Sequence, residues 1–412
     1  MVKILHFADA HIDIATHGPY DPDDGLFVRV KDFLKSLDAI VAAAIEEKVD
    51  LVIFAGDAYK DRSPAPTYQR EWGKRIMRLS RAGIPTILIT GNHDVSPSQK
   101  RAHAIQEFST LDVPHVVVVD RPRFLEPKDL EGLPVQVLGI PWVTPSLVKN
   151  AAPEAAEPNA ELDVIIENAV TVMIQQALEQ RDPALPFILA AHASIRGALI
   201  GDERTIKLGR DVQLSQGLVR DPRIDYVALG HIHRFQDLNP GGHPPVIYAG
   251  SIERVDFGEA GDDKGYVIAE VSRGETHYTW HKLATRPYRD LSVTLRAGDN
   301  AMEKILAALP QPEELEGAIV RLNISYPDNA DATIDDAQIR ERARLALELK
   351  INKIPKFSLR ARLGENGETQ SMTPEELLKL YWKQNHTDES EIDALQALGE
   401  RIIHADEAEA QP

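Results

Sequence analysis

The chain has 412 residues and a formal net charge of −18 at pH 7, with 43% hydrophobic and 27% charged residues. This balance describes a folded globular protein, and the length predicts two or three domains. The absence of cysteine excludes disulfides and thiolate metal sites, so His, Asp, Glu or Asn must hold any metal. The acidic charge argues against a protein whose whole surface binds nucleic acid, although divalent metals, a basic partner or a local basic patch can reverse the sign at one site.

The sequence also favours a cytoplasmic protein. Residues Met1–Lys3 lead directly into a strand pattern without a small-residue cleavage site, so we expect no signal peptide. The apolar runs fall short of the roughly 20 residues that a membrane helix needs, so we expect no membrane span.

The first part of the chain alternates short apolar, β-branched runs with segments of helical periodicity. Such alternation is typical of parallel strands joined by helical crossovers. Two further runs, 266–271 and 276–283, indicate a closing antiparallel pair, and 150–158 reads as a surface loop. The predicted strands are 2–8, 50–55, 86–90, 113–119, 135–140, 187–191, 224–229 and 246–249, and the predicted helices are 32–48, 67–81, 97–111 and 162–180.

Six of these strands end abruptly at polar residues, several of which are common metal ligands. Open α/β sheets place ligands at the carboxyl ends of their strands. A turn aspartate or a casual histidine could explain any one of the endings, but a coincidence at six strands is hard to sustain. The endings are Asp9-Ala10-His11, Gly56-Asp57, Gly91-Asn92-His93-Asp94, His192, Gly230-His231-Ile232-His233 and Gly250-Ser251.

Carboxylate, imidazole and amide oxygen ligands together suit a metal such as Mn²⁺ or Fe²⁺. Where one carboxylate bridges, such a set can hold two metals about 3.5–4 Å apart, which polarise a phosphoryl oxygen and activate water. An unligated histidine can protonate the leaving oxygen. The residues therefore predict a two-metal phosphoester hydrolase.

These motifs, complete and in order, resemble the signature of the calcineurin-like metallophosphoesterases. The resemblance implies a four-layer α/β/β/α sandwich that binds two divalent metal ions, for which we favour Mn²⁺. It also implies a role for each motif residue. Asp9, His11 and His233 hold the first metal, Asn92, His192 and His231 hold the second, and Asp57 bridges the two metals. His93 binds neither metal and serves as proton donor or transition-state stabiliser, and Asp94 orients His93.

The stretch after the last histidine narrows the resemblance to the SbcD and Mre11 nucleases. The similar segments are Gly250–Arg254, Asp256–Glu259, Lys264-Gly265, Ala191-His192, Gly197-Ala198, Asp202-Glu203 and the loop Arg62–Pro66. The resemblance implies a DNA nuclease subunit, associated with the nucleoid, that acts in double-strand break repair as a 3′–5′ exonuclease on duplex ends and an endonuclease on single strands or hairpins. Archaeal members can carry a second histidine three residues after the bridging aspartate. This chain has Lys60 there, which either contacts phosphate or is a solvated loop lysine.

The pattern changes near Arg286 to a small α+β unit. Its predicted strands are 291–295, 318–325 and 356–362, and its predicted helices are 301–309 and 335–349. Composition alone describes a structural appendage with an ordinary charged surface, whereas the resemblance implies a DNA-binding cap. The basic residues that would supply the cap's contacts to phosphate are Arg286, Arg289, Arg296, Arg321, Lys353, Lys356, Arg360 and Arg362.

Two amphipathic helices are predicted after a linker at 365–370. Thr373 is the expected N-cap of the first, and Thr387 or Asp388 begins the second. The pair could fold back as a hairpin or bind a partner, and the resemblance implies binding to an SbcC/Rad50-like ATPase. The chain contains no G-x-x-x-x-G-K-[ST] motif, so any dependence on ATP would come from another polypeptide.

We therefore expect a nuclease domain over 1–284, a capping domain over 285–366, an ATPase-binding segment over 371–405 and an acidic tail over 406–412. The resemblance also implies a homodimer through helices 67–81 and 97–111, for which Trp72 and Met77 are the candidate anchors. Two other functions stay open. One is a general phosphodiesterase or phosphatase on small or nucleotide substrates, which the net charge slightly favours. The other is a non-enzymatic scaffold, which the intact ligand set disfavours.

Overall fold

The computed structural model describes residues 1–95, 102–144, 148, 161–199, 212–327, 334–356, 373–384 and 389–403. The chain divides into two compact units. The first comprises Met1–Asp290, Glu316–Val320 and Ala346–Glu348, and the second comprises Leu291–Leu315, Arg321–Leu345 and Leu349–Pro412. Among the described helices, none is long and apolar enough to cross a membrane.

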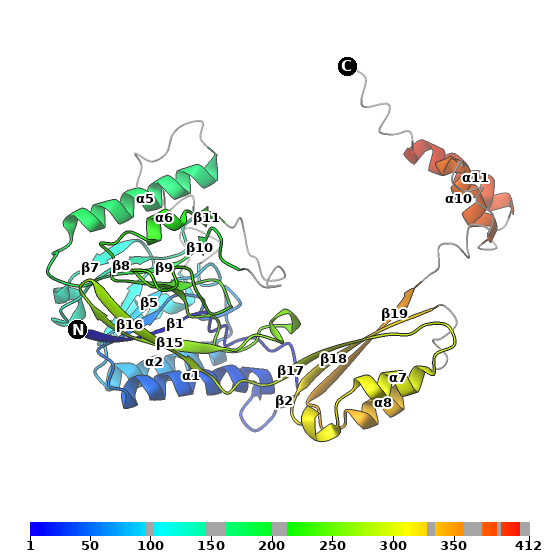
Figure 1. Ribbon diagram of the computed structural model, residues 1–412, viewed down its shortest axis with the longest axis horizontal. Helices are drawn as coiled ribbons and strands as arrows, with labels where there is room; N and C mark the ends of the chain where they lie inside the picture. Colours follow the sequence, from blue (N-terminus) through cyan, green and yellow to red (C-terminus); the bar gives the residue numbers. More distant parts are fainter. Residues whose placement is uncertain are drawn as a thin grey trace, which may run out of the picture. The chain divides into compact units, whose positions relative to one another are not determined.

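Two six-stranded sheets form the centre of the first unit (Figure 1). The first sheet has the order β16–β15–β1–β4–β5–β6, in which β1, β4, β5 and β6 are parallel and the β15–β16 hairpin adds antiparallel to β1. Its strands are β1 (Val2–Phe7), β4 (Leu51–Phe54), β5 (Thr86–Ile89), β6 (Val116–Val119), β15 (Gly265–Ser272) and β16 (Glu275–Lys282).

The second sheet has the order β13–β14–β12–β9–β8–β7, with four parallel strands in the middle and an antiparallel strand at each edge. Its strands are β7 (Arg123–Leu125), β8 (Gln136–Ile140), β9 (Phe187–His192), β12 (Tyr226–Gly230), β13 (Gln236–Asp237) and β14 (Val246–Tyr248). The edge strands β7 and β13 were not predicted, because runs of two or three residues leave no periodic pattern.

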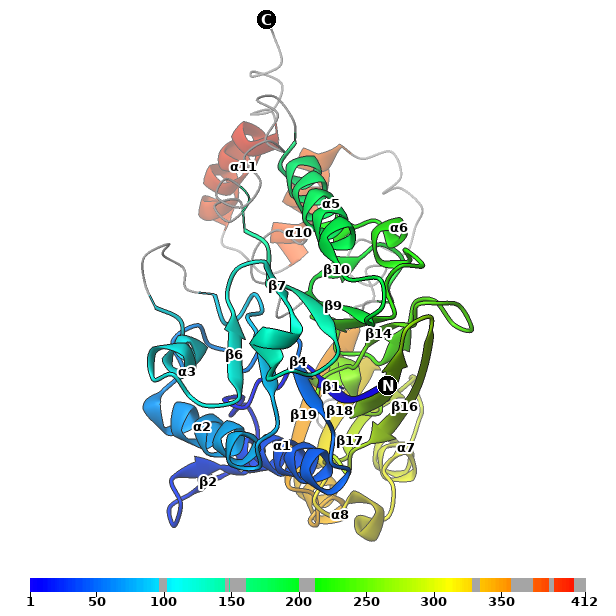
Figure 2. The same ribbon diagram turned by 90° about the vertical axis from the view of Figure 1, so that its left-hand side faces the viewer.

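The two sheets pack face to face between helices, which confirms the expected four layers. Alternate residues of a strand point to opposite faces of its sheet, and in β1 Ile4 packs toward the second sheet whereas Leu5 and Phe7 pack under helices. Figures 1 and 2 show the outer layers, with α1 and α2 on the first sheet and α5 and α6 on the second. These helices are α1 (Val28–Glu46), α2 (Pro66–Arg81), α5 (Leu162–Gln180) and α6 (Gln216–Val219).

Smaller elements connect these layers. Two-residue strands pair as β2 (Tyr20–Asp21) with β3 (Leu26–Phe27) and as β10 (Ser194–Ile195) with β11 (Gln213–Leu214). In place of the helix predicted over 97–111, the structure has a 3₁₀ turn at Ala104–Gln106 followed by the short helix α3 (Glu107–Thr110), and 97–101 lie outside the described residues. The loop predicted at 150–158 and the motif residues Asp202-Glu203 also lie outside them.

Trp72 lies on the face of α2 that packs into the core, not on the protein surface. The prediction of Trp72 as an interface anchor was therefore wrong. Its side chain is fully buried, with its ring centre 4.9 Å from Phe54 and 6.1 Å from Tyr59. Helical periodicity places Trp72 on the same face as Ile76 and Leu79, which are also buried. Met77 is half-buried.

The second unit is built on a three-stranded sheet with the order β17–β18–β19, and an apolar core joins the sheet to two helices. The elements are β17 (Tyr288–Thr294), α7 (Ala301–Ala308), β18 (Ile319–Pro327), α8 (Asp336–Arg342) and β19 (Glu348–Lys356). The helix prediction over 335–349 was too long, and the third strand was placed too late. Ala, Leu, Glu and Arg continue the helical composition past Arg342, but Leu349 and Ile351 pack against the core as strand residues. Residues 357–362 lie outside the described residues.

The last described elements are helices α10 (Pro374–Gln384) and α11 (Glu389–Ile403). The predicted cap forms: the Thr373 hydroxyl accepts from the Glu376 backbone N–H at 3.4 Å, and the Glu376 carboxylate accepts from the Thr373 N–H at 2.9 Å. The two helices pack together where Gly399 meets Leu378 and Trp382. The linker 365–370 and the tail 406–412 lie outside the described residues.

Candidate metal centre

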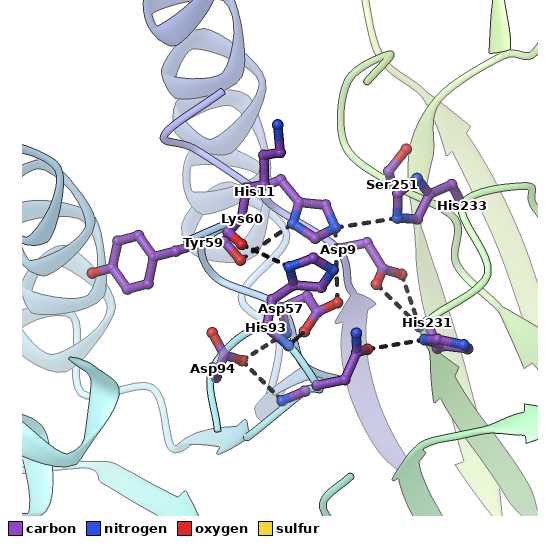
Figure 3. Close-up of polar contacts among 12 residues, drawn as sticks. Asp9, His11, Asp57, Tyr59, Lys60, His93, Asp94, His231, His233 and Ser251 are labelled. Atoms are coloured by element: carbon purple, nitrogen blue, oxygen red, sulfur yellow. Dashed lines mark hydrogen bonds and ion pairs between the residues drawn. The ribbon is translucent and has the colours of Figure 1, made fainter. Parts of the chain in front are cut away.

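The structure gathers all nine predicted site residues at the carboxyl ends of five strands. Two strand ends from the second sheet, β9 and β12, meet three from the first, β1, β4 and β5. Figure 3 shows the site residues that follow β1, β4, β5 and β12. Side-chain and backbone contacts link the residues into one cluster: Asp9, His11, Asp57, Asn92, His93, Asp94, His192, His231 and His233.

Asp9, His11 and His233 form one group whose potential ligand atoms lie within 4.8 Å of one another. The Nδ1 of His11 lies 3.3 Å from the Tyr59 carbonyl oxygen, and the Nδ1 of His233 lies 2.7 Å from a Glu259 carboxylate oxygen. Each Nδ1 therefore donates to its acceptor, which turns the two Nε2 atoms toward each other across 3.1 Å. Two ring nitrogens at this distance need a proton or another cation between them, so this donor set fits a metal ion.

Asp57, His192 and His231 form the second group. The Asn92 side-chain oxygen lies 2.9 Å from His192 Nε2 and 3.0 Å from His231 Nδ1, so it adds a fourth potential ligand. His192 donates its Nδ1–H to the Ala55 carbonyl oxygen at 2.7 Å, which again turns Nε2 toward the centre.

Asp57 lies between the two groups. Its Oδ2 is 3.4 Å from His192 Nε2 and 3.8 Å from His11 Nε2, and its Oδ1 accepts the His93 backbone N–H at 2.9 Å. One carboxylate oxygen therefore faces both groups, which is the geometry that a bridging ligand requires.

Burial perturbs the ionisation of these groups. Burial raises the pKa of Asp9 to about 7, and the nearby histidines only partly oppose it. Burial disfavours the charged form of His192, yet Asp57 beside it raises the pKa of His192 to about 9. Burial would also raise the pKa of Asp57, but His192 and His93 hold it well below its usual range. Protons thus balance the cluster's charges, and divalent cations would replace those protons.

Four of the predicted ligands hold a backbone conformation that residues with a side chain rarely adopt. Asp9, His11, Asp57 and His231 have φ values of 51°, 40°, 64° and 101°. Such conformations concentrate at functional sites, because the surrounding structure must hold them in place. Gly91 allows the turn after β5 to lie against Asp57, in the turn after β4. A Cβ at Gly91 would lie 2.0 Å from Asp57 Oδ1, so only glycine permits this close approach.

His93 and Asp94 have different partners from the ones expected. The His93 ring is held by the Lys60 carbonyl oxygen, 2.6 Å from Nδ1, and its centre lies 5.1 Å from that of His11. The Asp94 carboxylate instead accepts the backbone N–H groups of Asp57, Ala58 and Gly91 at 2.8–3.0 Å. Asp94 therefore links the turn after β4 to the turn after β5. Lys60 contributes its backbone carbonyl oxygen, which holds the His93 ring.

A buried ion pair between Glu259 and Lys264 contacts His233 on the side away from the predicted metal. The Glu259 carboxylate accepts from Lys264 Nζ at 2.8 Å and from the Val255 N–H at 2.9 Å, in addition to His233 Nδ1. Burial would raise the pKa of Glu259, but Lys264 and His233 hold it well below its usual range. The segment Asp256–Glu259 and Lys264-Gly265 carried a family resemblance in the sequence. No spacing rule could assign these residues a role, because the contacts form only in the fold.

Comparison with known proteins supports the chemical class of this site. A family model described as calcineurin-like phosphoesterase matches residues 2–235, more than half of the chain, and this range contains all nine residues. The chain belongs to the calcineurin-like phosphoesterases. Membership in this family indicates a phosphoester hydrolase, and the two groups of ligand residues indicate two divalent metal ions.

Two curated relatives extend the similarity beyond the family model. The chain is 27% identical to the uncharacterized metallophosphoesterase YhaO of Bacillus subtilis, over 68% of this chain and 60% of that protein. It is 29% identical to the SbcD component of nuclease SbcCD from Escherichia coli, over 66% of each. These alignments therefore span less than two thirds of the relatives' own lengths.

A solved dimetal phosphatase from Danio rerio matches 67% of this chain and 98% of its own at 10% identity, with a TM-score of 0.39.

Proposed function

We propose that the chain is the nuclease component of an SbcCD-like complex, which hydrolyses DNA phosphodiester bonds in double-strand break repair. The observation that carries the proposal is the complete metal-ligand cluster within a chain that is similar to the SbcD component of nuclease SbcCD over 66% of its length. The proposed activities are 3′–5′ exonuclease action on duplex ends and endonuclease action on single strands or hairpins.

In this proposal Asp9, His11 and His233 hold one metal ion, Asn92, His192 and His231 hold the other, and Asp57 is shared. Two bound divalent ions, for which we propose Mn²⁺, would polarise the phosphoryl oxygen and lower the pKa of water. The Lys60 carbonyl accepts the Nδ1–H of His93 and so fixes its ring. This contact leaves Nε2 of His93 to protonate the leaving oxygen. Asp94 keeps the two turns at their separation through its three backbone hydrogen bonds.

The DNA would contact the second unit, in the predicted capping domain. Lys350, Lys353 and Lys356 are exposed on β19, where Lys353 pairs with Asp336 at 3.1 Å, and Arg296 is exposed in the same unit. These cations offer a local basic surface on a chain whose net charge is −18. Contacts of this kind bind phosphates without reading the sequence.

A general phosphodiesterase on small or nucleotide substrates is the second candidate, supported by the net charge of −18, which disfavours binding of a polyanion such as DNA. The deciding experiment incubates the chain and Mn²⁺ with linear duplex DNA, with single-stranded DNA and with a p-nitrophenyl phosphodiester, each with and without the ATPase. The nuclease proposal expects DNA cleavage. Hydrolysis of the small ester without any DNA cleavage, even with the ATPase, would favour the second candidate.

Replacing Glu259 with glutamine should weaken Mn²⁺ binding by about 10- to 100-fold, because a carboxylate behind a metal-bound histidine orients its ring and raises its basicity. Isothermal titration should show this loss at one of two sites. Since Glu259→Gln leaves Lys264 buried beside a neutral partner, the double variant Glu259→Gln/Lys264→Met removes that charge, together with the Lys264 donation to the His233 carbonyl oxygen at 3.0 Å. A loss of equal size in both variants therefore assigns the metal effect to Glu259. The exposed Glu270→Gln is the matched control. Wild-type affinity in both Glu259 variants would contradict the role.

The helix pair α10–α11 is the proposed binding site for the ATPase. Tyr381 and Leu398 keep 45% and 51% of their surfaces exposed, although both are large and apolar. Replacing both with serine, or deleting residues 371–412, should abolish co-purification with an SbcC-like ATPase, as measured by pull-down. Val164→Ser, on α5 with 47% exposure, is the matched control. Unchanged co-purification of the deletion variant would refute this partner site.

A homodimer through the predicted segments 67–81 and 97–111 stays a proposal, now without Trp72. Its candidate apolar contacts are the half-buried Met77 and Leu111, which is 73% exposed. Light scattering at micromolar concentration should give twice the mass of one chain, and Leu111→Asp should lower the mass toward that of one chain. A wild-type mass of one chain would count against the dimer.

A further inference from the structure

Trp142 lies beside the second group of predicted ligands and has no part in the proposed metal binding or proton transfer. Its ring centre is 4.9 Å from that of His231, with 38° between the planes, and 6.0 Å from that of His192. It follows the buried strand β8 by two residues, and its backbone N–H donates to the Thr90 carbonyl oxygen at 2.9 Å. Thr90 directly precedes the Gly91–Asp94 turn. This backbone hydrogen bond therefore fixes Trp142 to the segment that carries Asn92 and His93.

The exposure of the cluster is uneven. Of the nine predicted site residues, eight keep at most 4% of their surface exposed, and His231 is the exception. Trp142 shares the intermediate exposure of His231. Within the part of the chain that the structure describes, the centre therefore reaches the surface beside this pair. A phosphodiester that approaches there passes the indole.

An aliphatic side chain could pack against His231 equally well, but it would not offer a flat aromatic face. Nucleobases stack on indole rings whatever their sequence, because every base has a π-face. The other three tryptophans have other surroundings: Trp72 is in the core, Trp280 stacks on Phe235 at 4.9 Å, and Trp382 lies near Gly399. Of the four tryptophans, Trp142 is therefore the one that lies against the predicted metal ligands.

We propose that Trp142 is a specificity-determining residue, whose indole stacks on the nucleobase adjacent to the phosphodiester bond that is cleaved. The centre then favours base-bearing phosphodiesters over base-free ones, and it favours strands whose terminal base is unstacked from its neighbours. This inference rests on the proposed function and deepens it, because it names the feature of the DNA strand that the site recognises.

The test compares two single-stranded substrates, an oligothymidylate and the same phosphodiester chain built from abasic tetrahydrofuran units. For the wild type, kcat/KM should be higher for the oligothymidylate. Trp142→Leu should reduce this preference by about 10-fold or more, mainly through KM, which is the range expected for the loss of one base-stacking contact. Trp142→Phe should keep part of the preference. Trp280→Leu, a matched substitution on β16, should keep all of it.

Equal losses on both substrates in Trp142→Leu would overturn the inference, since they would show that the indole only supports His231. An unchanged preference would overturn it as well. If the wild type cleaves neither strand but hydrolyses a p-nitrophenyl phosphodiester, the proposed nuclease function fails instead.

A binding measurement then still decides the role of Trp142. In the presence of Mg²⁺, thymidine 5′-monophosphate should quench the tryptophan fluorescence of the wild type more than deoxyribose 5-phosphate does. Trp142→Phe should lose this difference. Equal quenching of the wild type by both compounds would refute stacking on Trp142.

Discussion

Replacing His93 with alanine should lower kcat for DNA hydrolysis by about 10²- to 10⁴-fold while two metal ions stay bound, which is the usual contribution of a general acid. The ring is held by the Lys60 carbonyl and lies 5.1 Å from the His11 ring, but it belongs to neither group of ligand atoms. The backbone N–H of His93, which Asp57 accepts, survives the substitution. The variant therefore removes the imidazole and leaves the predicted ligands unchanged. Metal content after dialysis and single-turnover cleavage of DNA measure the two effects.

The leaving group distinguishes the two roles that are open to His93. A DNA alkoxide needs a proton in order to leave, whereas p-nitrophenolate is already a good leaving group. A general acid predicts a large loss on DNA and a much smaller loss on a p-nitrophenyl phosphodiester. Equal losses would instead assign His93 to transition-state stabilisation. His277→Ala, which changes an exposed histidine on β16, is the control. Loss of either metal ion from His93→Ala would contradict both roles.

Much of this architecture could be predicted because its sequence signals are local. Apolar runs in β1, β4, β5, β9 and β12 reveal buried parallel strands, and each run stops at a residue type that can bind a metal. The rule that ligands lie at the carboxyl ends of such strands then brings distant residues together. The predicted residues meet in the structure for this reason, although the sequence says nothing of the distances between them.

The features that could not be predicted depend on contacts between segments. Glu259 and Lys264 acquire a role only because the 3₁₀ turn at Phe257–Glu259 folds behind His233. Lys60 takes part through its backbone oxygen, which side-chain patterns do not reveal. The prediction of Trp72 as an interface anchor was wrong, because a tryptophan on a basic helix can point to the solvent or to the core. Its packing against Phe54 shows that it points to the core. The helix predicted over 335–349 failed because tertiary contacts of Leu349 and Ile351 outweighed helix propensity.

Replacing Asp57 with asparagine should prevent normal binding of both metal ions and lower hydrolysis on the order of 10³-fold or more. Asparagine tolerates the left-handed backbone of this position, where φ is 64°, so the change is chemical rather than conformational. Oδ1 accepts the His93 N–H, and the amide oxygen must keep that place. The amide nitrogen then replaces Oδ2, the atom that faces His192 and His11. An NH₂ group has no lone pair to offer a cation, so both metal positions lose the shared ligand.

The measurements are metal content, Mn²⁺ titration and the rise in Tm that Mn²⁺ produces. Because a ligand stabilises the state to which it binds, the wild type should show a concentration-dependent rise in Tm that Asp57→Asn lacks. Asp112→Asn provides a matched control, since Asp112 is exposed and also has a positive φ, of 49°. If Asp57→Asn bound two Mn²⁺ ions with wild-type affinity, Asp57 could not be the shared ligand. Its location between the two groups would then be a matter of packing alone.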